Sequence, residues 1–171
     1  MSALFPVHTP RIGLGIDLHR LAPGRPCTLG GVRIESEVGP VGHSDGDVIL
    51  HAVCDACLGA AGCDDLGTLF PDKDPRNAGR ASSEFCVEVM RKVASSGLQI
   101  VGIDVVVECE HPKIAPHRAA IRARLASLFQ VPTTNVNVKG KTGEGLDAIG
   151  RGEAIRATAV VLAAVPFHPQ P

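Results

Sequence analysis

The chain is poor in aromatic side chains: they make up 3% of its 171 residues, and neither Trp nor Tyr occurs. Proteins that hold single-stranded nucleic acid stack the bases on such rings, so recognition by stacking is not expected. Positive charge is not in excess either, because 17 Lys and Arg stand against 18 Asp and Glu. No net basic field attracts nucleic acid or an anionic lipid surface, and neither is an expected partner.

Long apolar runs are also missing. No stretch approaches the roughly 20 apolar residues that a membrane-spanning helix requires, so no membrane partner is expected. The first ten residues lack the charged and apolar regions of a secretory signal, and we expect residues 1–10 to form an N-terminal extension. We expect a cytoplasmic protein with a single domain over residues 11–166, followed by a short C-terminal tail over residues 167–171.

Six cysteines are present, but their spacing does not form a complete metal or disulfide framework. Cys54 and Cys57 have the C-x-x-C spacing of half a zinc site, and no second pair of this kind follows. On a helix both would face the apolar side, where a free cysteine behaves as a small hydrophobic residue. We therefore expect buried thiols within a core that, for want of aromatic rings, is mainly aliphatic.

Residues 11–19 are predicted to form a strand, because aliphatic side chains alternate with small and then polar ones. Asp17 and His19 lie two residues apart, so both point to the same side of that strand. Gly13 and Gly15 precede them on this side and leave room for a close approach to the backbone. The pattern favours a polar site on this side of the strand.

His51 lies on a helix that the sequence predicts to begin at Ser44 or Asp45. With the strand's carboxylate and imidazole it would complete a set of three ligands with an open fourth position, as in catalytic zinc sites. The alternative is three polar side chains that never meet, and spacing alone does not decide between the two. Asp47, one turn before His51, could orient the imidazole or could be a solvated acid.

The rest of the pattern predicts a compact α+β domain. Further strands are expected as a hairpin over 27–34 and at 99–110, 135–141 and 154–165. Helices are expected at 82–97, with Ser82 or Ser83 as the N-cap, and at 117–129. Loops are expected at 20–26, 39–42, 64–77, 112–116 and 142–152. The order β, β, α, α, β, α, β, β is typical of helices packed on one face of a mixed sheet.

Three segments have the composition of substrate-binding loops. His43 and Ser44 precede a helix N-terminus, where backbone N–H groups bind phosphate. Residues 65–72 combine carboxylates, a glycine and an aromatic ring in one long loop. Residues 141–144 offer a cation, a hydroxyl group and glycine backbone, which suit a polyphosphate. Each also has a plainer interpretation as a helix cap or a solvated connector.

Taken together, these motifs resemble the 2-C-methyl-D-erythritol 2,4-cyclodiphosphate synthase family, the cyclising enzymes of the non-mevalonate isoprenoid pathway. The resemblance covers residues 11–165 and rests on GIDLHR, GGVRI, HSDGDVILHAVCDACLGA, DLGTLFPDKDP, HPKIAPH, VNVKGKTGEGLD and GRGEAI. It implies a ferredoxin-like two-layer sandwich with a mixed sheet, helices packed on one face, and a homotrimer with active sites between subunits. The implied lyase reaction converts 4-diphosphocytidyl-2-C-methyl-D-erythritol 2-phosphate to the cyclic 2,4-diphosphate with release of CMP.

The resemblance also implies roles for individual residues. The implied ligands of Zn²⁺, or of Mn²⁺ or another divalent ion in its place, are Asp17, His19 and His51. A second ion, Mg²⁺ or Mn²⁺, would bridge the substrate diphosphate at Glu144. The implied catalytic residues are His43 and Thr142. Substrate contacts are implied for Asp17, His19, His43, Ser44, Asp65, Leu66, Gly67, Phe70, Asp72, Cys109, Pro112, Lys113, Ile114, Ala115, Lys141, Thr142, Gly143, Glu144 and Arg151.

Two departures from the family pattern stand out. Lys141 and Gly143 lie where many relatives have a run of threonines, which alters the groups around the Thr142 hydroxyl. Ala148 stands where some relatives have a phenylalanine lining a central cavity that can hold an isoprenoid diphosphate near Arg151. Whether that cavity takes such a ligand here is left open by the sequence.

Two other functions remain compatible with the same residues. A zinc phosphohydrolase would use the three ligands to activate water and would release linear products or inorganic phosphate. A sensor of nucleotides or isoprenoid diphosphates with a structural metal would bind tightly without turnover. Neither alternative accounts for the extended set of motifs.

Overall fold

The computed structural model describes residues 10–42, 44–71, 73–77 and 79–166. Its centre is a five-stranded sheet with the order β4-β1-β7-β5-β6. The strands are β1 (Arg11–Pro23), β4 (Val38–Val41), β5 (Gln99–Glu108), β6 (Val136–Lys141) and β7 (Ala154–Ala164), with β2 (Cys27–Leu29) and β3 (Val32–Ile34) in a separate hairpin. β5 and β6 are parallel and the other neighbours antiparallel, so the predicted mixed sheet is confirmed.

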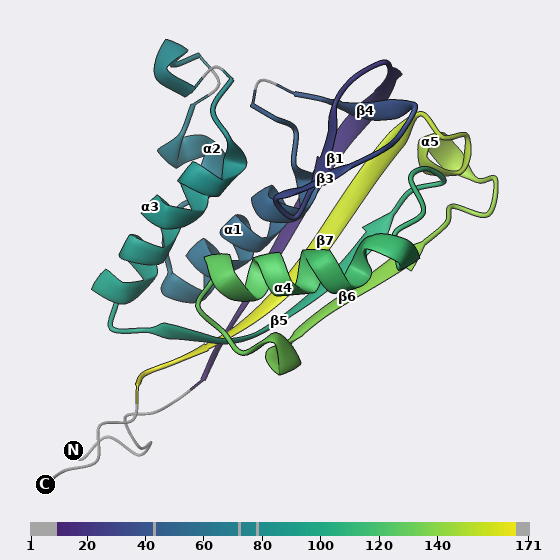
Figure 1. Cartoon of the computed structure of the whole chain (residues 1–171). Coiled ribbons are helices and arrows are strands. Elements are labelled where there is room, and N and C mark those ends of the chain that lie inside the picture. Colours follow the sequence, from purple (N-terminus) through teal and green to yellow (C-terminus); the bar gives the residue numbers. More distant parts are fainter. Residues whose placement is uncertain (1–9, 43, 72, 78, 167–171) are drawn as a thin grey trace, which may run out of the picture.

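Three longer helices cover one side of this sheet (Figure 1). They are α1 (Val48–Ala61), α3 (Ser82–Ser95) and α4 (Arg118–Leu128); α2 (Leu66–Leu69) and α5 (Asp147–Gly150) are single turns. α1 packs on β1 and β7, α4 packs on β6, and α3 packs on α1. The expected α+β arrangement with helices on one face is therefore confirmed. Within the described ranges, no helix is long and apolar enough to cross a membrane.

The connectivity differs from the ferredoxin-like expectation. A ferredoxin-like domain runs β-α-β-β-α-β. Here the long elements run β1, α1, α3, β5, α4, β6, β7, and α4 joins two neighbouring parallel strands. Parallel neighbours need such a crossover, whereas β6 passes to the nearby β7 through the short α5 alone. The general class was predicted correctly, but this detail of the topology was not.

The edge strand β4 was missed by the sequence patterns. Residues 20–26 and 39–42 were expected to be loops, yet β1 continues to Pro23 and pairs with Val38–Val41. Gly39 and Pro40 both argue against a strand, because glycine weakens pairing and proline removes a backbone donor. Proline is tolerated here because β4 lies at the edge of the sheet, where one side of its backbone has no partner strand.

The starts of α1 and α3 also differ from prediction. The N-cap of α1 is Asp47 rather than Ser44 or Asp45. The N-cap of α3 is Ala81, which makes no side-chain cap hydrogen bond, and Ser82 is the first helical residue. A serine, threonine or aspartate near an expected helix start is a common cap, so the pattern alone does not reveal which of several neighbours takes the role.

Asp47 anchors the β2–β3 hairpin to α1. Its side chain is completely buried. The carboxylate accepts four backbone N–H groups at 2.6–3.1 Å, from Gly30 and Gly31 in the hairpin turn and from Ile49 and Leu50 in the helix. Both interpretations of Asp47 left open by the sequence are therefore wrong: the carboxylate is not solvated, and its oxygens bind backbone groups and not His51.

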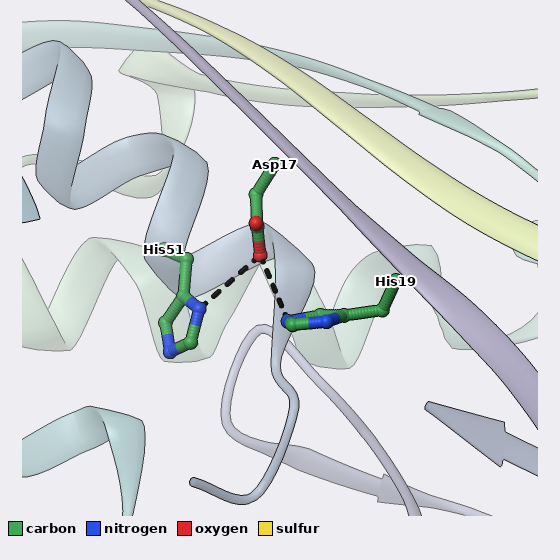
Figure 2. A group of neighbouring side chains, drawn as sticks. All are labelled: Asp17, His19 and His51. Atoms are coloured by element: carbon green, nitrogen blue, oxygen red, sulfur yellow. Dashed lines mark hydrogen bonds and ion pairs between the residues drawn. The ribbon is translucent and has the colours of Figure 1, made fainter. Parts of the chain in front are cut away.

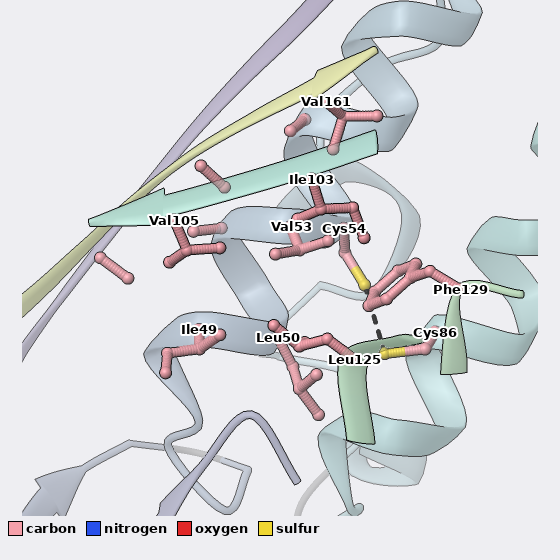
Figure 3. Close-up of a cluster of buried hydrophobic side chains, with 14 of the residues drawn as sticks. Ile49, Leu50, Val53, Cys54, Cys86, Ile103, Val105, Leu125, Phe129 and Val161 are labelled. Atoms are coloured by element: carbon pink, nitrogen blue, oxygen red, sulfur yellow. Dashed lines mark hydrogen bonds between the residues drawn. The ribbon is translucent and has the colours of Figure 1, made fainter. Parts of the chain in front are cut away.

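The core lies between the helices and the sheet and is mainly aliphatic, as predicted. Figure 3 shows Val53 and Cys54 of α1 facing Ile103 of β5, with Phe129 beside them. The Sγ atoms of Cys54 and Cys86 lie 3.6 Å apart without a disulfide. Burial raises the pKa of the neighbouring Cys57 thiol. These cysteines pack as small hydrophobic residues, as the isolated C-x-x-C motif indicated.

The side of β1 that faces α1 carries no side chains at Gly13 and Gly15. A Cβ atom on Gly15 would lie 2.0 Å from the carbonyl oxygen of Ala52, far inside contact distance. The helix can approach the strand this closely only because both positions are glycine. The close approach that the glycines predicted is therefore confirmed, and the approaching element is α1.

The opposite side of β1 and β7 is aliphatic and uncovered in the single chain. Six side chains there are between 38% and 71% exposed: Ile12, Leu14, Ile16, Leu18, Val160 and Leu162. They lie on adjacent antiparallel strands, where Ile12 pairs with Leu162 and Leu14 with Val160, so their surfaces are contiguous. Contiguous apolar surface of this kind is typical of a protein–protein interface.

Candidate metal centre and adjoining cavities

Asp17 and His19 of β1 meet His51 of α1 (Figure 2). Oδ2 of Asp17 lies 3.2 Å from Nε2 of His19 and 3.2 Å from Nδ1 of His51. One candidate ligand atom from each of the three residues falls within 4.8 Å of the others. The spacing left open whether these three side chains meet, and the structure brings them together. It depends on the close packing of α1 on β1, which sets the first turns of the helix against the polar end of the strand.

The electrostatics of the group favour an ionised carboxylate. Burial opposes ionisation of Asp17, but the close imidazoles of His19 and His51 outweigh it and lower the pKa of Asp17. Burial likewise disfavours the charged form of His51, but hydrogen bonding and proximity to Asp17 raise the pKa of His51. The carboxylate is thus available as an anionic ligand at neutral pH, while a proton competes for the imidazole of His51.

These residues fit a divalent metal ion. Within the described part of the chain, Nε2 of His19 is a buried polar atom without a hydrogen-bond partner. Its 3.2 Å contact with Asp17 is an ion-pair distance and not a hydrogen bond. A buried polar atom of this kind needs an explanation, and a cation between the three side chains supplies one. One carboxylate oxygen and two imidazole nitrogens form a ligand set of the catalytic zinc type.

The second ring nitrogen of His51 contacts two serines. Nε2 lies 2.8 Å from Oγ of Ser82 and 3.3 Å from Oγ of Ser44. The Ser82 hydroxyl also hydrogen-bonds to Oδ1 of Asp45, and its backbone N–H donates to Oδ2 at 3.0 Å. The sequence patterns missed this contact, because nothing in the spacing relates the first turn of α3 to His51.

A cavity of about 290 Å³ opens beside the metal group. It brings together the predicted site residues Asp17, His19, Ser44, His51, Leu66, Gly67 and Phe70. Asp65 does not line it; instead its carboxylate caps α2 by accepting the backbone N–H of Thr68 at 2.8 Å. The cavity also includes residues that were not predicted: Val41, Gly42, Asp55, Asn77 and Phe85. His43 and Asp72 lie outside the described residues.

The predicted loop 64–77 is partly ordered into turns that wall this cavity. It contains α2 and a short turn of 3₁₀ helix at Pro75–Asn77. Asp55 accepts the backbone N–H of Leu66 at 2.7 Å, which ties the loop to α1. The ring of Phe70 lies 4.6 Å from that of Phe85, and the Arg80 guanidinium sits 4.8 Å from the Phe85 ring centre. The loop is more than the solvated connector that remained an alternative.

A second cavity, of about 510 Å³, lies near the ends of β5 and β6. Its lining includes the predicted residues Cys109, Lys113, Ile114, Ala115, Lys141, Thr142 and Glu144, with Arg118 and Gly140 in addition. The two segments with implied substrate contacts, residues 109–115 and 141–144, therefore meet. Pro112 and Gly143 are adjacent without lining it: the carbonyl of Pro112 accepts from the Cys109 thiol, and the Gly143 N–H donates to Glu110. The Thr142 hydroxyl donates to Glu144.

The two cavities do not share a described lining residue. Asp17 lies in one row of the sheet with Ala157, Val107 and Gly140, so β7 and β5 separate the metal group from the second cavity. Three strand spacings amount to about 14 Å. Arg151 lines neither cavity and pairs with Glu153 at 2.9 Å.

The fold and the site define a small α+β protein with a candidate divalent-metal centre beside a substrate-sized cavity. The chain belongs to the YgbB family, whose sequence pattern matches residues 10–164. It is 47% identical over 152 residues to the 2-C-methyl-D-erythritol 2,4-cyclodiphosphate synthase of Rhodopirellula baltica, covering 89% of this chain and 92% of that protein. It is 49% identical over 154 residues to the synthase of Bordetella avium, covering 90% and 95%.

Solved structures agree with this membership. A 2C-methyl-D-erythritol-2,4-cyclodiphosphate synthase in a CDP-bound form superposes with a TM-score of 0.83 at 44% identity, covering 90% of this chain and 99% of that one. The CDP complex of IspF from Plasmodium falciparum gives a TM-score of 0.81 at 34% identity, covering 93% and 97%. The fold of this chain is therefore that of a synthase family whose members bind CDP in at least these two structures.

Proposed function

We infer that this chain converts 4-diphosphocytidyl-2-C-methyl-D-erythritol 2-phosphate to 2-C-methyl-D-erythritol 2,4-cyclodiphosphate and CMP, a step of the non-mevalonate isoprenoid pathway. The observation that carries the inference is the convergence of Asp17, His19 and His51 beside an open cavity, in a chain of the YgbB family. We propose residues 11–166 as the catalytic domain. The termini outside it, residues 1–9 and 167–171, lie beyond the described part of the chain.

The reaction is an intramolecular phosphoryl transfer. An oxygen of the 2-phosphate attacks the β-phosphorus, the bond from that phosphorus to the oxygen bridging to CMP breaks, and CMP leaves with the electron pair. No protein nucleophile or strong base is needed, because the attacking phosphate is already anionic. The main obstacles are repulsion between two anions and the alignment of an in-line displacement. Catalysis therefore calls for cationic and hydrogen-bonding groups placed around the phosphates.

We assign the metal ligands to Asp17, His19 and His51, with Zn²⁺ as the ion and Mn²⁺ as its alternative. When bound, the ion supplies positive charge that polarises phosphate oxygens and offsets their repulsion. The protein's part is to hold the three ligands rigidly on β1 and α1, and to offer the Ser44 hydroxyl beside them. His43 lies outside the described residues, and we assign it to the substrate phosphate that the metal ion would polarise.

The second cavity is assigned to the cytidine diphosphate part of the substrate. Its Lys141 ammonium and Thr142 hydroxyl would bind and align the diphosphate, and Glu144 would hold the second ion, Mg²⁺ or Mn²⁺. Residues 109–115 would enclose the cytosine. Leu66, Gly67 and Phe70 line the first cavity and are assigned with Asp65 and Asp72 to the sugar and erythritol groups.

We further propose that the protein is a homotrimer with its active sites between subunits. Two observations support this assembly. The metal cavity and the diphosphate cavity are separated within one chain, so one substrate would reach both more readily across a subunit boundary. The aliphatic side of β1 and β7 is uncovered and suits burial against another copy. The proposed trimer would have a central cavity near Arg151, Glu153 and Ala148, and we include an isoprenoid diphosphate as a ligand of that cavity in this proposal.

Leu14→Glu is expected to dissociate the assembly. Leu14 is 60% exposed in the middle of the aliphatic side, and a carboxylate there would have to be buried without a partner. Light scattering on a sizing column should show a fall from about three chain masses to one, with loss of turnover. Val87→Glu, at a half-exposed apolar position on α3, is the matched control and should keep the assembled mass. A wild-type protein of one chain mass would contradict the proposed trimer.

The reaction itself is tested by incubating the purified protein with the cytidine-diphospho substrate and Mg²⁺, followed by phosphorus NMR. The expected products are CMP and the cyclic diphosphate in equal amounts, and EDTA should abolish their formation. Linear products or inorganic phosphate would instead indicate a zinc phosphohydrolase. Tight binding of the substrate without any product would indicate a sensor.

A further inference from the structure

We propose that Ser82 and Asp45 are positioning residues, which hold the imidazole of His51 through Nε2 and direct Nδ1 at the metal site. The proposal rests on the metal site of the proposed function. It gives the first turn of α3 a role in the metal centre, whereas the sequence pattern indicated only a helix cap there.

The contacts form a short chain of hydrogen bonds from Asp45 through Ser82 to His51. Ser82 and Asp47 are the only fully buried polar side chains recorded over the described ranges. Both hydrogens that Ser82 can donate go to Asp45: the backbone N–H to Oδ2 at 3.0 Å and the hydroxyl to Oδ1. The same hydroxyl oxygen lies 2.8 Å from Nε2 of His51. Ser82 is thus fixed between a carboxylate and the imidazole.

The direction of these hydrogen bonds follows from which groups can donate a hydrogen. An ionised carboxylate only accepts hydrogen bonds, so the hydroxyl hydrogen of Ser82 points to Asp45. The oxygen of Ser82 then presents only lone pairs to His51, and Nε2 must carry the hydrogen. Ser44 is consistent with this, because its Oγ lies 3.3 Å from the same Nε2 and accepts the backbone N–H of Gly46.

The consequence appears at the other ring nitrogen. Nδ1 faces the cluster and donates a hydrogen bond to Oδ2 of Asp17 at 3.2 Å, because an ionised carboxylate only accepts. A neutral imidazole has one N–H group, so with a hydrogen held on Nε2 it is the hydrogen on Nδ1 that a bound metal ion would replace. Partners of this kind, which fix the tautomer and the ring orientation of a ligand histidine, typically change metal affinity by about 10- to 100-fold when removed.

Zinc affinity of the full chain, measured by competition with a chromophoric chelator, tests the proposal. Ser82→Ala removes the acceptor for Nε2–H and should weaken zinc binding by about 10- to 100-fold. Ser83→Ala is the matched control: Ser83 is the next residue of α3, half-buried, and no hydrogen bond of its hydroxyl is recorded over the described ranges. Its zinc affinity should stay within about twofold of wild type, well below that range.

Asp45→Asn is a second test because it removes one of the two oxygens that fix Ser82. Oδ1 of Asp45 accepts from the Ser82 hydroxyl and, at 3.3 Å, from the backbone N–H of Asp47, while Oδ2 accepts from the Ser82 N–H. An amide has a single oxygen, so Ser82 loses an acceptor in either orientation of the side chain. Zinc binding should fall, as in Ser82→Ala.

Nitrogen-15 NMR of the zinc-loaded protein reads the tautomer directly. Wild type should show zinc on Nδ1 and the hydrogen on Nε2 of His51. A wild-type hydrogen on Nδ1 overturns the proposal, even if a variant fails to fold. So do folded Ser82→Ala and Asp45→Asn proteins, checked by thermal unfolding, that bind zinc within twofold of wild type. Neither readout uses substrate, so absence of CMP formation would contradict the proposed reaction and leave this result standing.

Discussion

His51→Ala is expected to remove bound zinc and cyclase turnover together. The variant keeps only Asp17 and His19, so it loses one of three protein ligands. This change should weaken zinc binding by more than the 10- to 100-fold that loss of an outer partner costs. Turnover should fall by roughly 100-fold or more, the scale on which removal of one stabilising group in an active site is felt. Atomic emission after dialysis gives zinc per chain, and CMP release gives the rate.

His117→Ala controls for the loss of an imidazole elsewhere. His117 closes the 3₁₀ turn before α4, and the described contacts give its side chain no hydrogen bond. This variant should keep stoichiometric zinc, full turnover and the wild-type melting temperature. Full turnover or one zinc per chain in a folded His51→Ala protein would remove the basis of the proposed metal site.

The metal ligands could be predicted because each follows from a local rule. Strand alternation places Asp17 and His19 on one side, and the glycines before them indicate a close neighbour. His51 follows from the helix pattern and its motif. The structure adds the reason that the two elements meet, which is the packing of α1 onto a strand face without side chains.

Other features could not be predicted from spacing, because they arise from contacts between distant segments. Ser82 and Asp45 are 37 residues apart and come together only because α3 packs on α1. Asp47 was expected to face solvent or His51, yet it is buried by a hairpin that precedes it in the chain. β4 was missed because its glycine and proline are poor strand formers, and pairing with β1 outweighs that preference.

The same packing predicts that adding one methyl group lowers the stability of the protein on the strand side of the β1–α1 contact and raises it on the helix side. A Cβ atom on Gly15 would lie 2.0 Å from the backbone oxygen of Ala52 and 2.7 Å from the backbone nitrogen of Ala56. Backbone atoms cannot yield without moving the helix, so Gly15→Ala should lower the free energy of unfolding by about 3 kcal/mol, at the upper end for overpacking. The melting temperature should fall by roughly 10 °C for a domain of this size.

Gly59→Ala places its methyl group on the helix side of that contact. The nearest atom would be Cα of Gly13 at 3.8 Å, an ordinary contact distance. Alanine in a helix interior is favoured over glycine by about 0.5–1 kcal/mol, so this variant should melt a few degrees higher than wild type. Thermal unfolding of the metal-free proteins compares the two, and a fall in both would show that the helix does not accept a side chain at Gly59.

Zinc affinity should separate the same pair of variants. β1 carries Asp17 and His19 while α1 carries His51, so the distance between strand and helix sets the distance between the ligands. Gly15→Ala pushes the two elements apart two residues from Asp17 and should weaken zinc binding. Gly59→Ala, two helical turns beyond His51, should leave it unchanged. Unaltered zinc binding in a destabilised Gly15→Ala protein would mean that the ligands hold their geometry without the close contact of strand and helix.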